Sequence, residues 1–130
     1  MKTAVLLISH GSRVAGADGD LARIADMVQE MSGAEIVEVA FRERQQPDIQ
    51  AGIDACVARG AQRILLSPYF LFAGSHVLRD LPDEMARAGR RHRGLEMVLG
   101  RPLGIDRRLA EVVCTRIGET LADSGWELKE

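Results

Sequence analysis

The sequence lacks the roughly 20-residue apolar run that a membrane-spanning helix requires. Its first ten residues combine one lysine with a short apolar stretch and continue directly into His10 and Gly11, without the longer apolar segment and small-residue cleavage site of a signal peptide. We therefore expect a protein of the cytoplasm with no membrane partner.

Lysine is almost absent: of 17 basic residues, only Lys2 and Lys129 are lysine, and the others are arginine. Together with 19 acidic residues they give a net charge of −2, which provides no general attraction to nucleic acid. Two explanations of the arginine bias stay open. One is a GC-rich genome, and the other is a ligand with several carboxylates, which guanidinium groups bind in a bidentate manner.

Cysteine is scarce, and the phosphate-binding glycine motifs are missing. Cys56 and Cys114 are too far apart for a CxxC motif, and each lies in an apolar helical pattern, so we expect both to be buried. Neither GxGxxG nor GxxxxGK[ST] occurs. The turn at residues 11–13 only weakly resembles a phosphate-binding turn. A flavodoxin-like domain that binds a phosphorylated ligand there remains one alternative.

Four short apolar segments, at residues 4–9, 35–41, 63–67 and 95–99, alternate with four helical patterns. This order predicts an α/β fold: a single three-layer domain over residues 1–130, related to flavodoxin, with a four-stranded, mainly parallel sheet flanked by helices. The first and third segments are apolar without alternation, as is typical of parallel strands covered on both faces.

Glycine, proline and aspartate mark the ends of the predicted helices. The first helix ends at Gly33, and the second has Pro47 in its first turn and ends at Gly60. The third covers about residues 77–88, where Pro82 either falls in a first turn or splits the segment. The last begins after Asp106 as N-cap, ends at Gly125 and is expected to bury four apolar side chains, those of Leu109, Val112, Val113 and Ile117.

Polar residues that carry chemistry follow three of the predicted strands. His10 follows the first, Glu43 the second and His76 the third, and ligands of such sheets bind at the carboxyl ends of the strands. Two imidazoles at one edge can bind a transition metal ion or accept protons near neutral pH. A single histidine there is usually a surface or capping residue, but two together favour a site. Glu43 is equally well explained as a third ligand or proton acceptor and as an exposed ion-paired loop residue.

Two further residues have competing interpretations. Asp80, four residues after His76, either orients that imidazole or caps a helix that begins at Leu81, and the cap is slightly favoured. His92 lies in a basic turn at the opposite end of the sheet from His10. We interpret His92 as solvated surface, with a subunit contact as the alternative.

These motifs resemble the short CbiX-type class II chelatases of cobalamin and sirohaem synthesis, from Leu6 to about Leu121. The resemblance rests on SHGSR at residues 9–13, VAF at 39–41 with Glu43 and Pro47, PYFLFAGSH at 68–76, DLP at 80–82 and PLG at 102–104. It implies a lyase that inserts a divalent metal ion into sirohydrochlorin. Co²⁺ is the first choice, and Fe²⁺ and Ni²⁺ are alternatives.

The resemblance also implies roles for residues. His10 and His76 would bind the metal ion, which is a substrate rather than a permanently bound cofactor, and with Glu43 they would be catalytic. The substrate-binding residues would be Arg13, Arg42, Arg44, Gly74, Ser75 and Arg79. An apolar wall for the ring could come from Phe70, Leu71, Phe72 and Val77, although core packing explains that stretch equally well.

Members of this family pair as homodimers whose facing sheet ends enclose the macrocycle, which implies the same here. A non-catalytic carrier of metal or tetrapyrrole on the same fold is the alternative function, and turnover would separate it from the enzyme.

Overall fold

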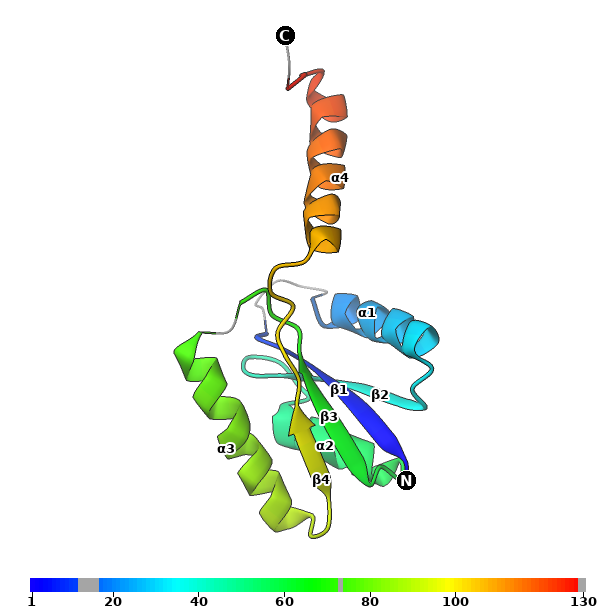
Figure 1. The fold of residues 1–130 in the computed structure, drawn as a ribbon, viewed down its shortest axis with the longest axis vertical. Coiled ribbons are helices and arrows are strands. Elements are labelled where there is room, and N and C mark those ends of the chain that lie inside the picture. The colour runs from blue at the N-terminus through cyan, green and yellow to red at the C-terminus, as the bar shows by residue number, and fades with distance from the viewer. Residues whose placement is uncertain (12–16, 73, 129–130) are drawn as a thin grey trace.

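In the computed structural model of the chain, residues 1–11, 17–72 and 74–128 are described, except for the side chains of residues 17, 18, 75, 76 and 78. Strands and helices alternate as the sequence predicts (Figure 1). The elements are β1 (Thr3–Ser9), α1 (Ala17–Ser32), β2 (Ile36–Phe41), α2 (Ile49–Ala58), β3 (Arg63–Pro68), α3 (Ser75–Arg91), β4 (Glu96–Leu99) and α4 (Arg107–Ser124). In this part of the chain, no helix has the length and apolarity to cross a bilayer.

The strands form one sheet in the order β2-β1-β3-β4, and every neighbouring pair is parallel. The predicted α/β fold with a parallel sheet is therefore confirmed. β1 lies in the middle, with Val5 opposite Val37 of β2 on one side and Leu65 of β3 on the other. The exits of β1, β2 and β3 consequently lie next to one another at the carboxyl edge.

The core has two parts, one on each face of the sheet. On one face, Leu6 and Ile64 pack with Ile53 of α2 and Leu81 of α3, and all four side chains are fully buried. On the other face, α1 covers β1 and β2 through a smaller cluster of Leu7, Ala25 and Val37. Burial of these apolar side chains is the main force that holds the helices against the sheet.

The glycine in the middle of α2 sets the distance between that helix and the sheet. A Cβ atom on Gly52 would lie 2.8 Å from the Ala40 Cβ and 2.9 Å from the Leu6 Cδ1. Because real Cβ contacts are longer, α2 packs this closely only with glycine at this position. The close packing fixes the start of α2, and with it the loop that leads from β2 into the helix.

Pro47 and Pro82 differ from their predicted positions in the helices. Pro47 precedes α2 rather than lying in its first turn, because Asp48 is the N-cap and its carboxylate accepts a hydrogen bond from the Ala51 amide (2.9 Å). Pro82 lies inside α3 and neither starts nor splits the helix. Burial of Leu81 and Ala88 in the core offsets the backbone hydrogen bond that proline cannot donate.

The ends of α4 confirm the prediction, but its packing does not. Asp106 caps the helix through the Arg108 amide (2.9 Å), and Gly125 ends it in the left-handed conformation (φ 69°). However, no residue of α4 is buried, and Cys114, also predicted to be buried, is exposed, unlike Cys56. The reason is visible in Figure 1: α4 leaves the carboxyl edge of the sheet and points away from the other elements.

Candidate functional site

Main-chain hydrogen bonds join the exits of β1 and β2 at the carboxyl edge. The Arg42 amide donates to the Ser9 carbonyl (2.8 Å), and the Glu43 amide donates to the His10 carbonyl (3.1 Å). These bonds continue the parallel pairing beyond the last residues of the two strands. His10 and Glu43, which the sequence placed at one edge, are therefore neighbours in the structure.

Gly11 allows the two loops to approach this closely. Its φ of +97° is a left-handed conformation, and a Cβ atom there would lie 2.0 Å from the Glu43 carbonyl oxygen. Such a contact is impossible, so any larger residue would push the loop of Glu43 away from His10. The glycine after the histidine is thus a geometric requirement of the site.

The His10 ring is held on one side and exposed on the other. It stacks on the ring of Phe70, with centroids 4.1 Å apart and an angle of 29° between the planes. Phe70 follows β3, whose exit is joined to β1 by a hydrogen bond from the Tyr69 amide to the Ile8 carbonyl (2.7 Å). Core packing therefore positions the imidazole, while the residue remains exposed to a ligand.

Glu43 and Arg44 form a loose pair at the same edge. Their Oε1 and Nε atoms are 3.8 Å apart, and both side chains are about half exposed. An ion pair of this kind contributes little free energy because solvent screens it. The pairing predicted for an exposed loop is thus present, and it leaves the Glu43 carboxylate accessible to solvent.

Arg42 and Asp80 form a stronger pair that the sequence did not reveal. The Asp80 Oδ2 accepts hydrogen bonds from Arg42 Nη2 (2.5 Å) and Nε (3.2 Å), and it joins the exit of β2 to α3. The prediction that Asp80 is an N-cap is wrong, because α3 begins five residues earlier and its N-cap is Gly74. Arg42, predicted to bind a substrate carboxylate, is occupied by a carboxylate of the protein.

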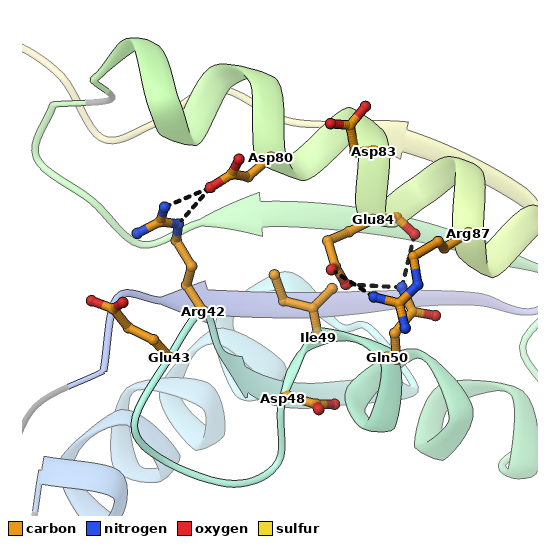
Figure 2. A pocket seen from close by; sticks show the side chains of 9 residues that line it. All are labelled: Arg42, Glu43, Asp48, Ile49, Gln50, Asp80, Asp83, Glu84 and Arg87. Carbon is orange, nitrogen blue, oxygen red and sulfur yellow. Dashed lines mark hydrogen bonds and ion pairs between the residues drawn. The ribbon is translucent and has the colours of Figure 1, made fainter.

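A pocket of about 330 Å³ lies beside this ion pair, between the start of α2 and the side of α3 (Figure 2). Figure 2 shows Arg42 reaching across to Asp80, while Gln50 and Arg87 both contact Glu84. The pocket is mainly acidic; its lining residues are Arg42, Glu43, Asp48, Ile49, Gln50, Asp80, Asp83, Glu84 and Arg87. Its carboxylates would repel a ligand that carries carboxylates itself.

The remaining predicted site residues are only partly described. Arg13 lies outside the described residues, as do the side chains of Ser75 and His76. The backbone places His76 as the second residue of α3, directly after the β3 exit and thus at the same edge. Gly74 and Arg79 are both exposed there. Among the side chains that the structure describes, no three His, Cys, Asp or Glu residues are close enough to hold a metal ion.

The expected apolar wall is divided between core and surface. Phe70 and Val77 belong to the core, each with 4% exposure, so core packing explains why these two positions are apolar. Leu71 and Phe72 are exposed by 54% and 70%. Of the four residues expected to form the wall, Leu71 and Phe72 are therefore the two that present apolar surface at the carboxyl edge.

His92 lies at the opposite edge, as predicted, but it is not solvated surface. Its Nε2 is 2.7 Å from the Asp54 Oδ1, the side chain is largely buried, and Arg91 binds the same carboxylate at 2.6 Å. The hydrogen bond with His92, with a further contribution from Arg91, lowers the pKa of Asp54. Asp54 and His92 thus hold α2 against the end of α3.

Fold and site together define a parallel three-layer α/β protein with a histidine and a carboxylate at the carboxyl ends of two adjacent strands, β1 and β2. The chain belongs to the CbiX family: the model of that family, described as CbiX, matches residues 4–120.

Several relatives and a solved structure are similar over almost the whole chain. The sirohydrochlorin ferrochelatase of Priestia megaterium is 37% identical over 121 residues, which cover 92% of this chain and 45% of the relative. The sirohydrochlorin cobaltochelatase of Methanopyrus kandleri is 34% identical, with coverage of 92% and 98%. The sirohydrochlorin chelatase SirB of Bacillus subtilis subspecies spizizenii, solved in complex with cobalt, superposes with a TM-score of 0.83 at 35% identity and coverage of 92% and 51%.

These relatives fall into two sizes. This chain spans about half the length of the Priestia ferrochelatase and of SirB, but nearly all of the Methanopyrus cobaltochelatase.

Proposed function

We propose that this chain is a lyase that inserts a divalent metal ion into sirohydrochlorin. The observation that carries the proposal is that a main-chain hydrogen bond places His10 and Glu43 next to each other at the carboxyl edge. The relatives of this chain are named sirohydrochlorin chelatases. Co²⁺ is the first choice, and Fe²⁺ and Ni²⁺ are alternatives. The names of relatives support both cobalt and iron, and a relative was solved with cobalt. The ion is a substrate, and no permanently bound cofactor is proposed.

The chemistry requires two proton transfers and one ligand exchange. Two inner pyrrole N–H groups of the ring lose their protons while the ion moves from protein atoms to the four ring nitrogens. An imidazole is both a ligand for these metals and a base near neutral pH, and a carboxylate can accept a proton as well. We assign metal binding to His10 and His76, and proton acceptance to the same histidines together with Glu43.

A site that must release its ion should bind it through few protein atoms. A closed cage of four ligands is typical of structural metal sites, whereas open positions are typical of sites that exchange ligands. Stacking on Phe70 leaves one face of His10 exposed, and Glu43 is half exposed. This openness supports transfer of the ion to a ring that approaches the same edge.

The acetate and propionate groups of the ring need cations. Arg44 and Arg79 are exposed at the carboxyl edge, and with Arg13, Gly74 and Ser75 they form the proposed substrate-binding set. We also keep Arg42 in that set, although binding to a substrate carboxylate would compete with Asp80. Leu71 and Phe72 are the exposed apolar contacts for the flat ring.

We further propose that residues 1–130 act as one chelatase domain in the cytoplasm and form a homodimer. A single copy leaves the carboxyl edge open, and a second copy facing that edge would enclose the ring between the two. The tetrapyrrole is then the only other partner proposed.

Metal insertion is tested anaerobically with the purified full-length protein, sirohydrochlorin and Co²⁺, Fe²⁺ or Ni²⁺, by following the visible spectrum over time. Insertion above the spontaneous rate is expected, and it should be lost in His10→Ala and His76→Ala. His92→Ala is the matched control, because His92 lies at the opposite edge of the sheet. Binding of ring or metal without faster insertion would instead support the carrier alternative.

A further inference from the structure

One face of α4 is apolar and uncovered. Leu109, Val113, Ile117 and Leu121 follow one another at four-residue spacing, which places them on one side of the helix. No residue of α4 is buried, and the side chain of Val113, in the middle of the apolar side, is 57% exposed. Helices in proteins gain most of their stability from packing of an apolar face, and the 18-residue α4 has no such packing within its own chain.

The same chain has an uncovered apolar area on its sheet. The strand register places Val5, Leu65 and Val98 side by side on the face that α1 covers only over β1 and β2. Val98 is 60% exposed as a result. Strands of parallel sheets are normally covered by helices on both faces, and among the described residues no helix covers this half of the face.

A groove next to this area has the character of a helix-binding surface. It lies between α1 and the exit of β3, has a volume of about 420 Å³, and includes Ile24, Met27 and Tyr69 among its lining residues. Met27 and Met31, four residues apart on α1, are both exposed. We give the name β3–β4 face to the apolar surface made by Leu65 and Val98 of the sheet together with Met27 and Met31 of α1.

The helix does not cover this face of its own sheet in the structure. The segment before α4 is fixed to the exit of β3 by hydrogen bonds from the Leu103 and Gly104 amides to the carbonyls of residues 70 and 71 (2.9 and 2.8 Å). Only Ile105 and Asp106 separate this anchor from the first residue of α4. Figure 1 shows α4 continuing outward beyond the carboxyl edge instead of folding back along the sheet.

We propose that α4 packs on the β3–β4 face of a second copy of this chain, and that the second copy returns its own α4 in the same way. Such a reciprocal exchange buries both uncovered surfaces with a single two-fold axis. Because α4 extends beyond the carboxyl edge, the second copy lies over that edge. The inference rests on the homodimer proposed above and specifies what holds it together.

The test measures the mass of the full-length protein in solution by light scattering coupled to gel filtration. The wild type is expected as a dimer, and Val113→Glu on the helix and Val98→Glu on the sheet should each give a monomer. Thr115→Glu introduces the same charge on the other side of α4 and should leave the dimer intact. Circular dichroism checks the fold; Val98 and Val113 are both more than half exposed, so we expect each variant to stay folded.

Mixing the two monomeric variants separates reciprocal exchange from other dimers. The intact helix of the Val98→Glu chain can pack on the intact sheet of the Val113→Glu chain, so partial recovery of dimer is expected. A mixture that stays monomeric overturns the exchange, and so does a Val98→Glu variant that stays dimeric. A monomeric wild type that still inserts metal overturns the exchange and the dimer but leaves the chelatase activity standing.

Discussion

The imidazole of His10 lies on the aromatic ring of Phe70, with their centroids 4.1 Å apart. Phe70 is 4% exposed, and its carbonyl accepts a hydrogen bond from the Leu103 amide (2.9 Å), so its ring is fixed within the core. The position of an exposed histidine is therefore determined by a buried residue in the loop that follows β3.

Replacement of Phe70 by leucine should slow metal insertion several-fold while the protein stays folded. The substitution removes the stacked ring but keeps an apolar side chain, so we expect a loss of up to about 1.5 kcal/mol in the free energy of unfolding. Ile64→Val is the control, because Ile64 is buried in the same core but lies at the start of β3, at the opposite end of the sheet from His10. Equal activity of the two variants would show that stacking does not position the imidazole.

Gly11→Ala should abolish most of the activity. The added Cβ would lie 2.0 Å from the Glu43 carbonyl oxygen, so the loop that carries Glu43 must move. Gly33→Ala is the matched control: Gly33 also has a positive φ (75°), but nothing lies within 4 Å of the added atom. Both variants place an alanine in the left-handed conformation, which costs about 1–2 kcal/mol of backbone strain. Only Gly11→Ala should lose metal insertion, measured by the anaerobic assay.

The Arg42–Asp80 pair should show coupling in a double-mutant cycle. Arg42 is 25% exposed and Asp80 45%, so solvent screens the pair and we expect a coupling of about 1 kcal/mol or less in the free energy of unfolding. The variants are Arg42→Gln, Asp80→Asn and their combination, unfolded in urea. Additive effects would mean that the ion pair does not hold α3 to the β2 exit.

The two cysteines should differ in their reaction with a thiol reagent. Burial, followed by the charge of Glu38, raises the pKa of Cys56 to about 12, so this thiol is protonated and inaccessible in the folded protein. Cys114 is exposed on α4. One thiol per chain should therefore react with Ellman's reagent before unfolding and two in urea, with Cys114→Ser removing the native reaction. Two rapidly reacting thiols in the native protein would contradict the structure.

The contribution of Asp54 to stability should disappear in acid. His92 and Arg91 lower the pKa of this carboxyl, so its ionised form favours the folded state. The stabilisation is fully present above the pKa of the unfolded chain and is lost as the pH falls through the lower pKa of the folded state. Asp54→Asn should be less stable than the wild type at neutral pH, by up to about 1 kcal/mol because the carboxylate is partly exposed. Urea unfolding at a series of pH values should show this difference shrinking in acid; a constant difference would exclude the ionic contribution.

The sequence predicts the helices and strands well because their signals are local. Apolar runs, the capping aspartate at position 106 and the glycine at position 125 act within a few residues of the ends that they mark. Burial of α4 was predicted wrongly for the same reason. Its apolar stripe shows that the helix has a side to cover, but no local pattern shows which molecule provides the covering surface, and Cys114 shares that error.

The edge of the sheet was predictable, but the contacts around it were not. Topology alone brings His10 and Glu43 together, since the ends of adjacent parallel strands meet. Asp80 lies 38 residues from Arg42, and His92 lies 38 residues from Asp54, a separation at which sequence spacing carries no information about contacts. The stacking of His10 on Phe70 likewise depends on how two loops pack.

The bonds that join the exits of β1, β2 and β3 run from main-chain amides to main-chain carbonyls. Of the twenty amino acids, proline alone lacks the amide proton, so substitutions at positions 42, 43 and 69 leave the donors in place. Side chains at these three positions can therefore change without removing the main-chain hydrogen bonds that join the strand exits. Under the proposed function, new side chains at such positions are a route to a different metal preference or different ring substituents, and the main-chain frame should persist in these variants.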